Sequence, residues 1–330
     1  MNAETNLPET LFEAIQYYAT GDNAFNLLVS RRWPNGVICP TCGATDAKFI
    51  GTRKLWECRG KHAKRQFSVK VGTIFEDSPI KLEKWFAAMW LVTNCKNGVS
   101  SYEIAREIGV TQKTGWFMLH RIRLAMEAGS FLKSKMSGTV EADESYIGGQ
   151  AKFMHKDVKA RRGLALGHAA AAKTAVMGIL QRPTETQPVS KVLAVVLPKT
   201  PTKVAAMANL KANVELGSEV QTDCARIYED VNRDYTHKVV DHVEAYVQNN
   251  VHTNGLENFW SLLKRSIKGT YVSVEPCHLG RYVAEQVFRF NERKDDNHGR
   301  FLNVLGKVFG RLIQYKQLIG TDTLGLPCQA

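Results

Sequence analysis

Three acidic residues fall within five positions of a segment that otherwise has the pattern of a β-strand. In VEADESYIGG, residues 140–149, Glu141, Asp143 and Glu144 lie among apolar side chains. Strand residues alternate between two faces, so Glu141 and Asp143 share one face and Glu144 takes the other. A buried carboxylate without a partner is costly. Either cations neutralise these acids or the segment is not buried.

Two further acids occur in segments that could bring them to the same place. Asp223 ends a predicted strand, and an acid at a strand's end lies at the rim of the sheet, where α/β sites form. Glu257 lies in the first turn of a predicted helix in HTNGLENFWSLLKRSIKGTY, residues 252–271. On that helix an apolar stripe (Leu256, Trp260, Leu263, Ile267) lies opposite a polar face (Glu257, Ser261, Lys264, Lys268). Glu257 therefore projects from the polar face of a helix whose apolar face packs against the rest of the domain.

Two Asp on strands and one Glu on a helix supply the carboxylate oxygens that hard cations prefer. Such a set can hold two Mg²⁺ ions, one activating water or a 3′-hydroxyl and the other stabilising the leaving 3′-oxygen in a displacement at phosphorus. The pattern alone is unspecific, because a chain with 32 acidic residues offers many such triples. Surface acids in helix pairs, such as Glu257 with Lys264, are the alternative.

A second group of residues has the spacing of metal ligands. Cys39 and Cys42 form a CxxC pair, and the CxxxH pair of Cys58 and His62 begins 16 residues later. Two close pairs of ligands separated by a short loop suit a closed, tetrahedral and structural zinc site. His62 takes the fourth position because no fourth Cys lies nearby. A chance pairing of cysteines is the alternative.

SSYEIAREIGVTQKTGWFMLHRIRLAM, residues 100–126, has the pattern of a helix-turn-helix. Gly109 breaks the first amphipathic helix, and Thr111 can cap the second. Side chains at the start of a second helix can read bases in the major groove, and later arginines can meet phosphates. The predicted base contacts are Gln112, Lys113 and Thr114, and the predicted phosphate contacts are Arg121 and Arg123. Two helices with a glycine turn also occur in helical domains that bind no DNA.

The composition is that of a globular protein with a basic surface. The 330 residues are enough for two or three domains, and the net charge of +12 favours a polyanionic partner such as nucleic acid. No apolar run reaches the length of about 18 residues that a membrane span needs, and the polar N-terminus is unlike a secretory signal. Seven cysteines, three of them clustered, do not form a disulfide framework and indicate a reducing cytoplasm.

The chain is predicted to be a multidomain α+β protein. Its predicted parts are an N-terminal helical segment (1–32), a zinc ribbon (33–78), a helix-turn-helix region (79–135), a catalytic domain (136–316) and a tail (317–330). Residues 8–30 have the pattern of one amphipathic helix. Strands are predicted near 139–147, 174–181, 190–197, 219–223 and 237–241, and helices near 202–213, 254–267, 277–294 and 301–316. Strands followed by helices predict a mixed sheet with helices packed on it.

The order of these motifs resembles one family of bacterial insertion-sequence transposases, the ISXO2-like family. VEADESYIGG, QTDCARIY and above all HTNGLENFWSLLKR carry the resemblance, and RQFSVKVGTIFEDSPIKLEKW, residues 65–85, is also similar to the family. The resemblance implies an RNase H-like catalytic domain of α/β mixed-sheet type that cuts and joins DNA with Mg²⁺ or Mn²⁺. The family's ribbon usually has two CxxC pairs, whereas the second pair here is CxxxH.

Matching the motifs residue by residue implies a catalytic, Mg²⁺-binding triad of Asp143, Asp223 and Glu257. Asn254 is a minor alternative as a catalytic residue, Lys264 matches a basic residue of the Glu helix, and Glu141 either supports the site or contributes a ligand. The DNA-binding set then also includes Arg161 and Arg162 in the basic segment 151–173, with Lys264, Arg265 and Lys268.

The resemblance implies a nucleoid-associated, cytoplasmic transposase that binds double-stranded DNA at its element ends and target. Because transposition joins two ends, a homodimer or larger synaptic complex without membrane partners is expected. Two alternatives stay open: a DNA-binding regulator without enzymatic activity, and a related nuclease that cuts without joining.

Overall fold

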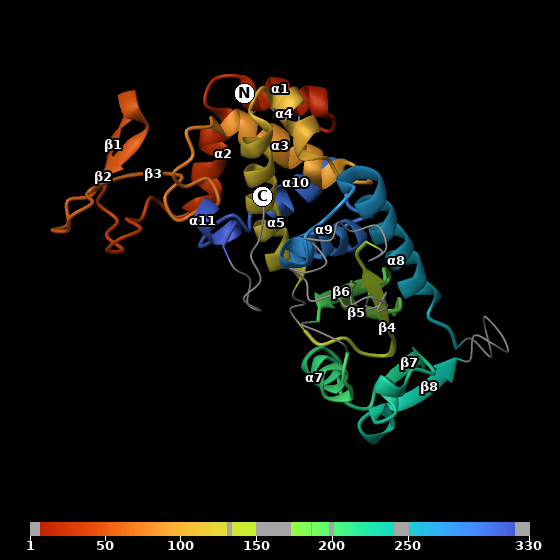
Figure 1. Cartoon of the computed structure of the whole chain (residues 1–330). Coiled ribbons are helices and arrows are strands. Elements are labelled where there is room, and N and C mark those ends of the chain that lie inside the picture. The colour runs from red at the N-terminus through yellow and green to blue at the C-terminus, as the bar shows by residue number, and fades with distance from the viewer. Residues whose placement is uncertain are drawn as a thin grey trace. The chain divides into compact units, whose positions relative to one another are not determined.

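The computed structural model describes residues 7–130, 134–149, 173–185, 187–197, 201–240 and 251–320 (Figure 1). The described residues form two compact units, one from residues up to Ala128 together with Lys294–Ile319, and the other from within Gly129–Arg293. Within these ranges, no helix combines the length and apolar character needed to cross a bilayer. The five-part domain division stays a prediction.

The first unit combines a small sheet with helices. Its antiparallel strands pair in the order β1 (Lys48–Ile50), β2 (Leu55–Glu57), β3 (Gln66–Ser68). Its helices are α1 (Leu11–Ala19), α2 (Asn23–Arg32), α3 (Leu82–Asn94), α4 (Ser101–Ile108), α5 (Gln112–Ser130, continuing past the unit's boundary), α10 (Asn297–Leu305) and α11 (Tyr315–Leu318). The ring of Tyr18 packs on Phe86 and Phe301 at centroid distances of 5.2 and 5.3 Å, which joins α1, α3 and α10 in one core.

Two predicted helices differ from the structure in extent. The single helix expected over 8–30 is broken at Gly21, whose φ of +55° lies in the left-handed region, so α1 and α2 are separate. The helix expected over 301–316 begins earlier, and α10 ends at Leu305. The chain beyond it pairs with a loop instead, since Ile74 N donates to the Val308 carbonyl at 3.1 Å.

The second unit contains a five-stranded mixed sheet in the order β6-β5-β4-β7-β8. The strands are β4 (Thr139–Ile147), β5 (Thr174–Gln181), β6 (Lys191–Val196), β7 (Glu219–Asp223) and β8 (Thr236–Val240), close to the predicted positions. β5 runs antiparallel to β4 and β6, whereas β4, β7 and β8 are parallel. With the small Cys-rich region of the first unit, this sheet confirms the predicted multidomain α+β class.

Helices cover both faces of this sheet (Figure 1). On one face, Val140 and Ala142 of β4 share a buried cluster with Ala206 and Leu210 of α7 (Lys203–Asn213). On the other face, buried β5 and β6 side chains cluster with α8 (Asn254–Ser266) and α9 (Leu279–Asn291). A π-helical turn, Ile267–Tyr271, extends α8.

α8 approaches β5 closely at one glycine. A Cβ on Gly178 would lie 2.7 Å from Cζ2 of Trp260 and 2.8 Å from Cδ2 of Leu256, distances that real contacts do not reach. Gly178 is also the residue that pairs with Asp143 across the β4–β5 ladder. The missing side chain therefore lets α8 lie directly over the strand pair that carries Asp143.

We expect Gly178→Ala to lower the free energy of unfolding by about 1–3 kcal/mol, because overpacking displaces Trp260 and Leu256. Gly280→Ala in α9 is the matched control, since its Cβ would lie 3.9 Å from Cγ2 of Val196, an ordinary van der Waals contact. An added Cβ at this exposed helical position should be neutral or stabilise by about 0.5–1 kcal/mol. Urea denaturation of both variants checks this, and equal stabilities would contradict the close approach.

Candidate active site and zinc centre

Three elements of the second unit bring their acids to one region. Asp143 lies on β4, Asp223 is the last residue of β7, and Glu257 stands in the first turn of α8. A pocket of about 340 Å³ is lined by Asp143, Glu144, Ser145, Glu257, Trp260, Ser261 and Lys264. Carboxylate and hydroxyl oxygens with one ammonium group suit a divalent cation and a phosphate in the same pocket.

Asp143 is half-buried and held by two donors. The Trp260 indole Nε1 donates to Oδ2 at 2.9 Å, and the Glu144 amide donates to Oδ1 at 2.8 Å. Burial, the largest cause, and the charges of Asp223 and Glu257 together raise the pKa of Asp143 to about 6, although the two hydrogen bonds lower it. The three acids therefore lie close enough to interact, and a cation would relieve their repulsion.

Asp223 is placed by the strand ladder. The parallel pairing of β4 with β7 sets Glu141 against Gln221, so the same offset brings Asp143 level with Asp223 two residues further on. The Asp223 Oδ1 accepts the Ala225 amide at 3.0 Å, which turns the chain away after the strand. The strand's end thus presents this carboxylate at the sheet's rim.

Glu144 points to the opposite face, as alternation predicts. Its Oε2 accepts the phenol of Tyr228, a buried residue of the cluster around α7, at 2.6 Å. Burial is the main cause that raises the pKa of Glu144 to about 7. This partner is a neutral phenol from a short 3₁₀ turn, Arg226–Tyr228.

The other predicted site residues of this region divide into exposed and buried ones. Lys264 lines the pocket two turns after Glu257, and Arg265 and Lys268 are exposed beside it. Asn254 is the first residue of α8 and is exposed, outside the pocket's lining. Glu141 is buried and engaged with other protein groups.

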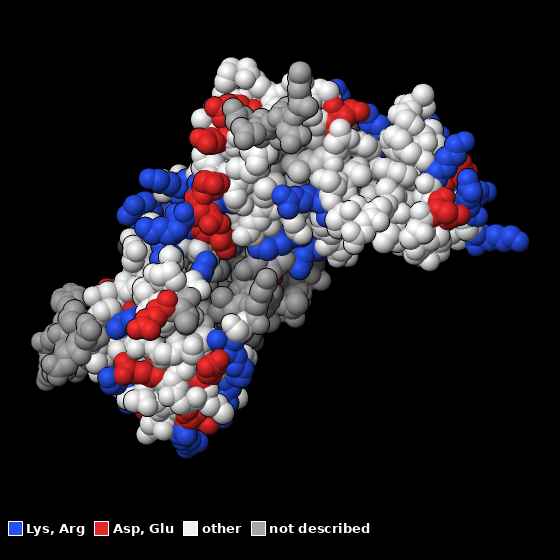
Figure 2. All heavy atoms as spheres, turned by 180° about the vertical axis from the view of Figure 1, so that it is seen from behind, with Lys and Arg blue, Asp and Glu red and all other residues white. Residues whose placement is uncertain are grey.

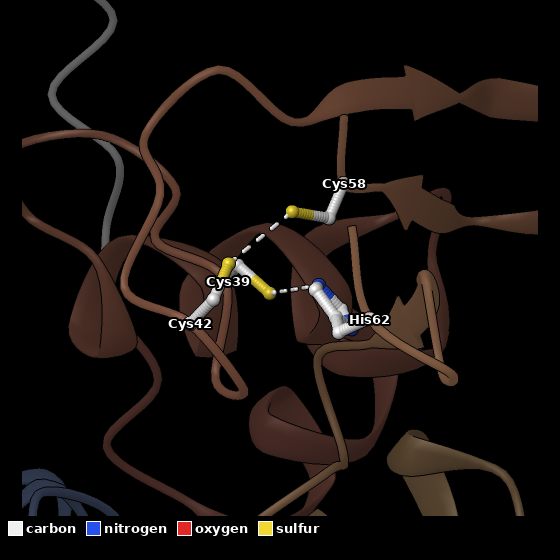
Figure 3. Close-up of side chains that lie close together, drawn as sticks. All are labelled: Cys39, Cys42, Cys58 and His62. Atoms are coloured by element: carbon white, nitrogen blue, oxygen red, sulfur yellow. Dashed lines mark hydrogen bonds between the residues drawn. The ribbon is translucent and has the colours of Figure 1, made fainter. Parts of the chain in front are cut away.

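The Cys-rich region brings four ligand atoms together (Figure 3). One donor atom from each of Cys39, Cys42, Cys58 and His62 lies within 4.8 Å of the others. The Cys39 Sγ is 3.5 Å from Nε2 of His62, and the Cys42 and Cys58 sulfurs are also 3.5 Å apart. Tetrahedral ligands at about 2.0–2.3 Å from zinc are themselves about 3.3–3.8 Å apart. The donor set and its spacing fit a structural Zn²⁺.

The loop around this zinc centre wraps the ligands closely. The Gly60 amide donates to the Cys58 sulfur at 3.2 Å. A Cβ on Gly60 would come within 3.4 Å of Cys42, Cys58 and His62 atoms. Trp56 of β2 and Phe67 of β3 are buried, and their rings stack with their centroids 6.1 Å apart.

The helix-turn-helix pair forms as predicted, but its polar side chains have partners within the unit. Gly109 has a φ of +63°, and the Thr111 hydroxyl caps α5 by accepting the Thr114 amide at 3.2 Å. Gln112 donates to the Ser101 hydroxyl at 2.9 Å, and the Lys113 ammonium lies 4.5 Å from the centre of the Tyr315 ring. Base contacts by Gln112, Lys113 and Thr114 would have to replace these interactions.

Arg121 and Arg123 are buried, which argues against the predicted phosphate contacts. Arg121 is 4% exposed and donates to the carbonyls of Ile74 and Glu76 at 2.8 and 2.6 Å. Arg123 is 0% exposed. Arg121 therefore ties a loop to α5. Arg161 and Arg162 lie outside the described residues.

Two regions match models of transposase domains. Residues 135–291 match the ISXO2-like transposase domain, and residues 19–60 match the transposase zinc-ribbon domain. A relative in Halobacterium salinarum, described as an uncharacterized protein in transposable element ISH50, is 30% identical over 261 residues. The aligned region covers 76% of this chain and 84% of that relative. The chain belongs to the ISXO2-like transposase family. The predicted resemblance is confirmed, and the zinc-ribbon match supports structural zinc in this transposase.

Sequence reasoning missed the polar roles of three residues in this transposase. Trp260 was assigned to the apolar stripe of α8, yet its indole N–H reaches Asp143. Tyr228 and Arg182, which bond Glu144 and Glu141, were not singled out. A buried Trp needs a partner for its N–H, and that requirement was the available signal for Trp260.

We expect His62→Ala to weaken zinc binding by at least about 10-fold, because a direct ligand is lost, whereas His62→Cys should retain it. Cys224→Ser removes an exposed thiol of the other unit and should leave the zinc content unchanged. Zinc content after dialysis against graded chelator checks this. Wild-type retention by His62→Ala would remove His62 from the ligand set.

We expect Asp143→Asn to stabilise the protein without added Mg²⁺. Asp143 has a folded-state pKa of about 6, above the ordinary value of 3.8 for an aspartate, so its ionisation destabilises the fold as pH rises through that window. The gain in the free energy of unfolding should be about 1–3 kcal/mol at pH 8 and smaller at pH 5. Urea denaturation at both pH values measures it.

The control for this measurement is Asp230→Asn, which alters a partly exposed carboxylate whose partner is the cation of Arg233. It should change stability by no more than about 0.5 kcal/mol at either pH. An Asp143→Asn variant that is less stable than wild type at pH 8 would contradict the crowding of charge around Asp143.

Proposed function

We propose that this transposase binds the ends of its insertion sequence, cleaves to free 3′-OH ends and joins them to target DNA. The observation that carries the proposal is geometric: Asp143 and Glu257 line one pocket, and Asp223 ends the strand that pairs with β4. Acids from three separate elements meet beside a pocket that also contains Lys264. Charge repulsion of this kind is unfavourable to folding and suits a site that receives cations.

The carboxylates of Asp143, Asp223 and Glu257 would hold Mg²⁺ or Mn²⁺. When bound, two such ions activate the attacking oxygen and stabilise the leaving 3′-oxygen. In the first step water attacks phosphorus and the P–O3′ bond breaks, which frees the 3′-OH. In the second step that 3′-OH forms a new P–O bond with target DNA, and the target's own 3′-oxygen leaves. Lys264 would orient a phosphate oxygen in the pocket.

The chain's basic surfaces support DNA as the partner. Lys and Arg side chains gather on the zinc ribbon, where acidic side chains are interspersed (Figure 2). The exposed basic residues around the zinc centre are Arg53, Lys54, Arg59, Lys61, Lys64 and Arg65. Lys264, Arg265 and Lys268 add exposed positive charge beside the pocket. Phosphate contacts of this type position DNA without reading its sequence.

Base contacts at the start of α5 belong to the same proposal, as does an assembly of two or more copies. Gln112, Lys113 and Thr114 lie at the N-terminal end of the second helix of the pair, where major-groove readers place base contacts. Joining two element ends in one reaction requires at least two DNA-bound copies. Asn254 keeps its minor claim as a catalytic residue.

The test of this function is Mg²⁺-dependent cleavage. We expect Asp143→Asn, Asp223→Asn and Glu257→Gln each to lower cleavage of supercoiled DNA carrying the element ends at least about 1,000-fold, since metal catalysis contributes several kcal/mol. DNA affinity should stay within a factor of a few. Glu215→Gln, at an exposed acid of the same unit, should cleave as wild type.

The products separate this function from its alternatives. Joined products indicate a transposase, cut DNA without joining indicates a nuclease, and binding without cutting indicates a regulator. Normal cleavage by Asp143→Asn would remove the proposed triad.

A further inference from the structure

Glu141 forms a buried ion pair beneath the three acids. Its side chain is 1% exposed, and its Oε1 lies 2.8 Å from Nε of Arg182. It stands two residues before Asp143 on β4, on the same face of the strand. A charge with so little exposure requires compensation, which the guanidinium supplies.

The second oxygen of Glu141 caps α8. The Glu141 Oε2 accepts the Leu256 amide at 3.0 Å, although the two residues are 115 positions apart. Leu256 lies in the first turn, where backbone N–H groups have no partner within the helix and a negative charge is favourable. The N-cap residue Thr253 makes no side-chain capping bond to α8, all of which lies within the described range 251–320.

The helix end lies directly against this carboxylate. A Cβ on Gly255 would be 2.8 Å from the Glu141 Oε2, so the backbone of α8 comes closer here than a side chain would permit. Both Glu141 oxygens are therefore occupied by protein donors.

Arg182 extends the contact to a third strand. One guanidinium nitrogen of Arg182 donates to Gln221 Oε1 at 2.8 Å and to the His252 carbonyl at 2.7 Å. The His252 amide donates to the same Gln221 oxygen at 2.9 Å. Arg182, which follows β5, thus links β4, β7 and the segment that leads into α8.

The residues that make these contacts lie one or two positions from each of the three acids along the same strand or helix. Glu141 and Gln221 face each other across the β4–β7 ladder, and Asp143 and Asp223 follow two residues later on their strands. Glu257 follows Leu256 directly. We propose that Glu141 and Arg182 form a positioning clamp that sets the relative places of Asp143, Asp223 and Glu257, and that Glu141 is not a metal ligand. This inference rests on the proposed function of those acids.

A buried ion pair is a poor source of stability, because desolvation offsets most of the attraction. The pair does fix the relative orientation of the groups that it joins, since each of its hydrogen bonds forms only within a narrow range of geometries. The clamp joins three strands and a helix at the level where small displacements would separate the metal-binding oxygens. An ion pair that contributed only to stability would not need to lie next to the three acids.

The test compares Glu141→Gln, Arg182→Gln and the double variant by single-turnover cleavage across Mg²⁺ concentrations. Each single variant should lower the cleavage rate per folded molecule at saturating Mg²⁺ by about 10–100-fold without loss of DNA affinity. The double variant should lose no more cleavage activity than the more impaired single variant, because both substitutions remove the same interaction. Wild-type cleavage by Arg182→Gln, with loss in Glu141→Gln alone, would make Glu141 a ligand and overturn the clamp.

The matched control is Glu285→Gln, which breaks another buried Glu–Arg pair, that with Arg289 in α9. It should lower the melting temperature as Glu141→Gln does, yet leave cleavage per folded molecule unchanged. An equal loss of cleavage in this control would show that Glu141→Gln acts through general instability, and would overturn the proposal.

Hydrogen exchange tests the clamp independently of cleavage. In Glu141→Ala the amide of Leu256 should exchange at least 10-fold faster, whereas amides in the middle of α9 should not change. Unchanged exchange at Leu256 overturns the clamp even if the enzyme cleaves. Faster exchange in a protein whose wild type never cleaves supports the clamp and defeats the proposed function instead.

Discussion

The close approach of α8 to the β4–β5 pair is the constraint on which the site depends. Gly178 leaves the space that the Trp260 ring and Leu256 occupy, and it pairs with Asp143 in the ladder. A helix packed at the ordinary distance from a sheet would hold its first-turn carboxylate further from the strand. Because α8 is close, the same helix supplies Glu257 to the pocket and an indole N–H to Asp143. One missing side chain therefore governs both the position of one acid and the orientation of another.

The packing that brings the acids together also works against their ionisation. Burial is the first cause of the raised pKa of Asp143, and the charges of Asp223 and Glu257 add to it. Apolar packing around α8, from Leu256, Phe259 and Leu263 among others, supplies the compensating stability, at about 1.5–3 kcal/mol for each fully buried side chain. Buried acids that repel one another are expected at a site that receives cations. Folded proteins tolerate such unfavourable local interactions where function requires them.

The sequence predicted elements well where periodicity was strong and failed where tertiary contacts decided. The strands 139–147, 174–181 and 219–223 are found as expected because apolar alternation or apolar runs define them. The helix expected over 301–316 ends at Leu305, and the chain after it pairs with the loop at Ile74 instead. Arg121 has a charge visible in the sequence, but the carbonyls that bury it come from distant segments. The partners of Glu141 were equally invisible, since 41 and 115 residues separate it from Arg182 and Leu256.

Strand geometry gives three neighbouring acids three different chemistries. Glu141 and Asp143 share a face, but Glu141 lies under the helix end, where Arg182 and an amide neutralise it, and Asp143 lies at the pocket, where other acids oppose its charge. Glu144 turns to the other face and meets the phenol of Tyr228. Asp143 shares the pocket with Glu257, and the charges of Asp223 and Glu257 both oppose its ionisation. An added cation would therefore relieve the repulsion at Asp143. The chemistry of such a segment therefore follows from what each face of the strand meets and cannot be assigned from residue type alone.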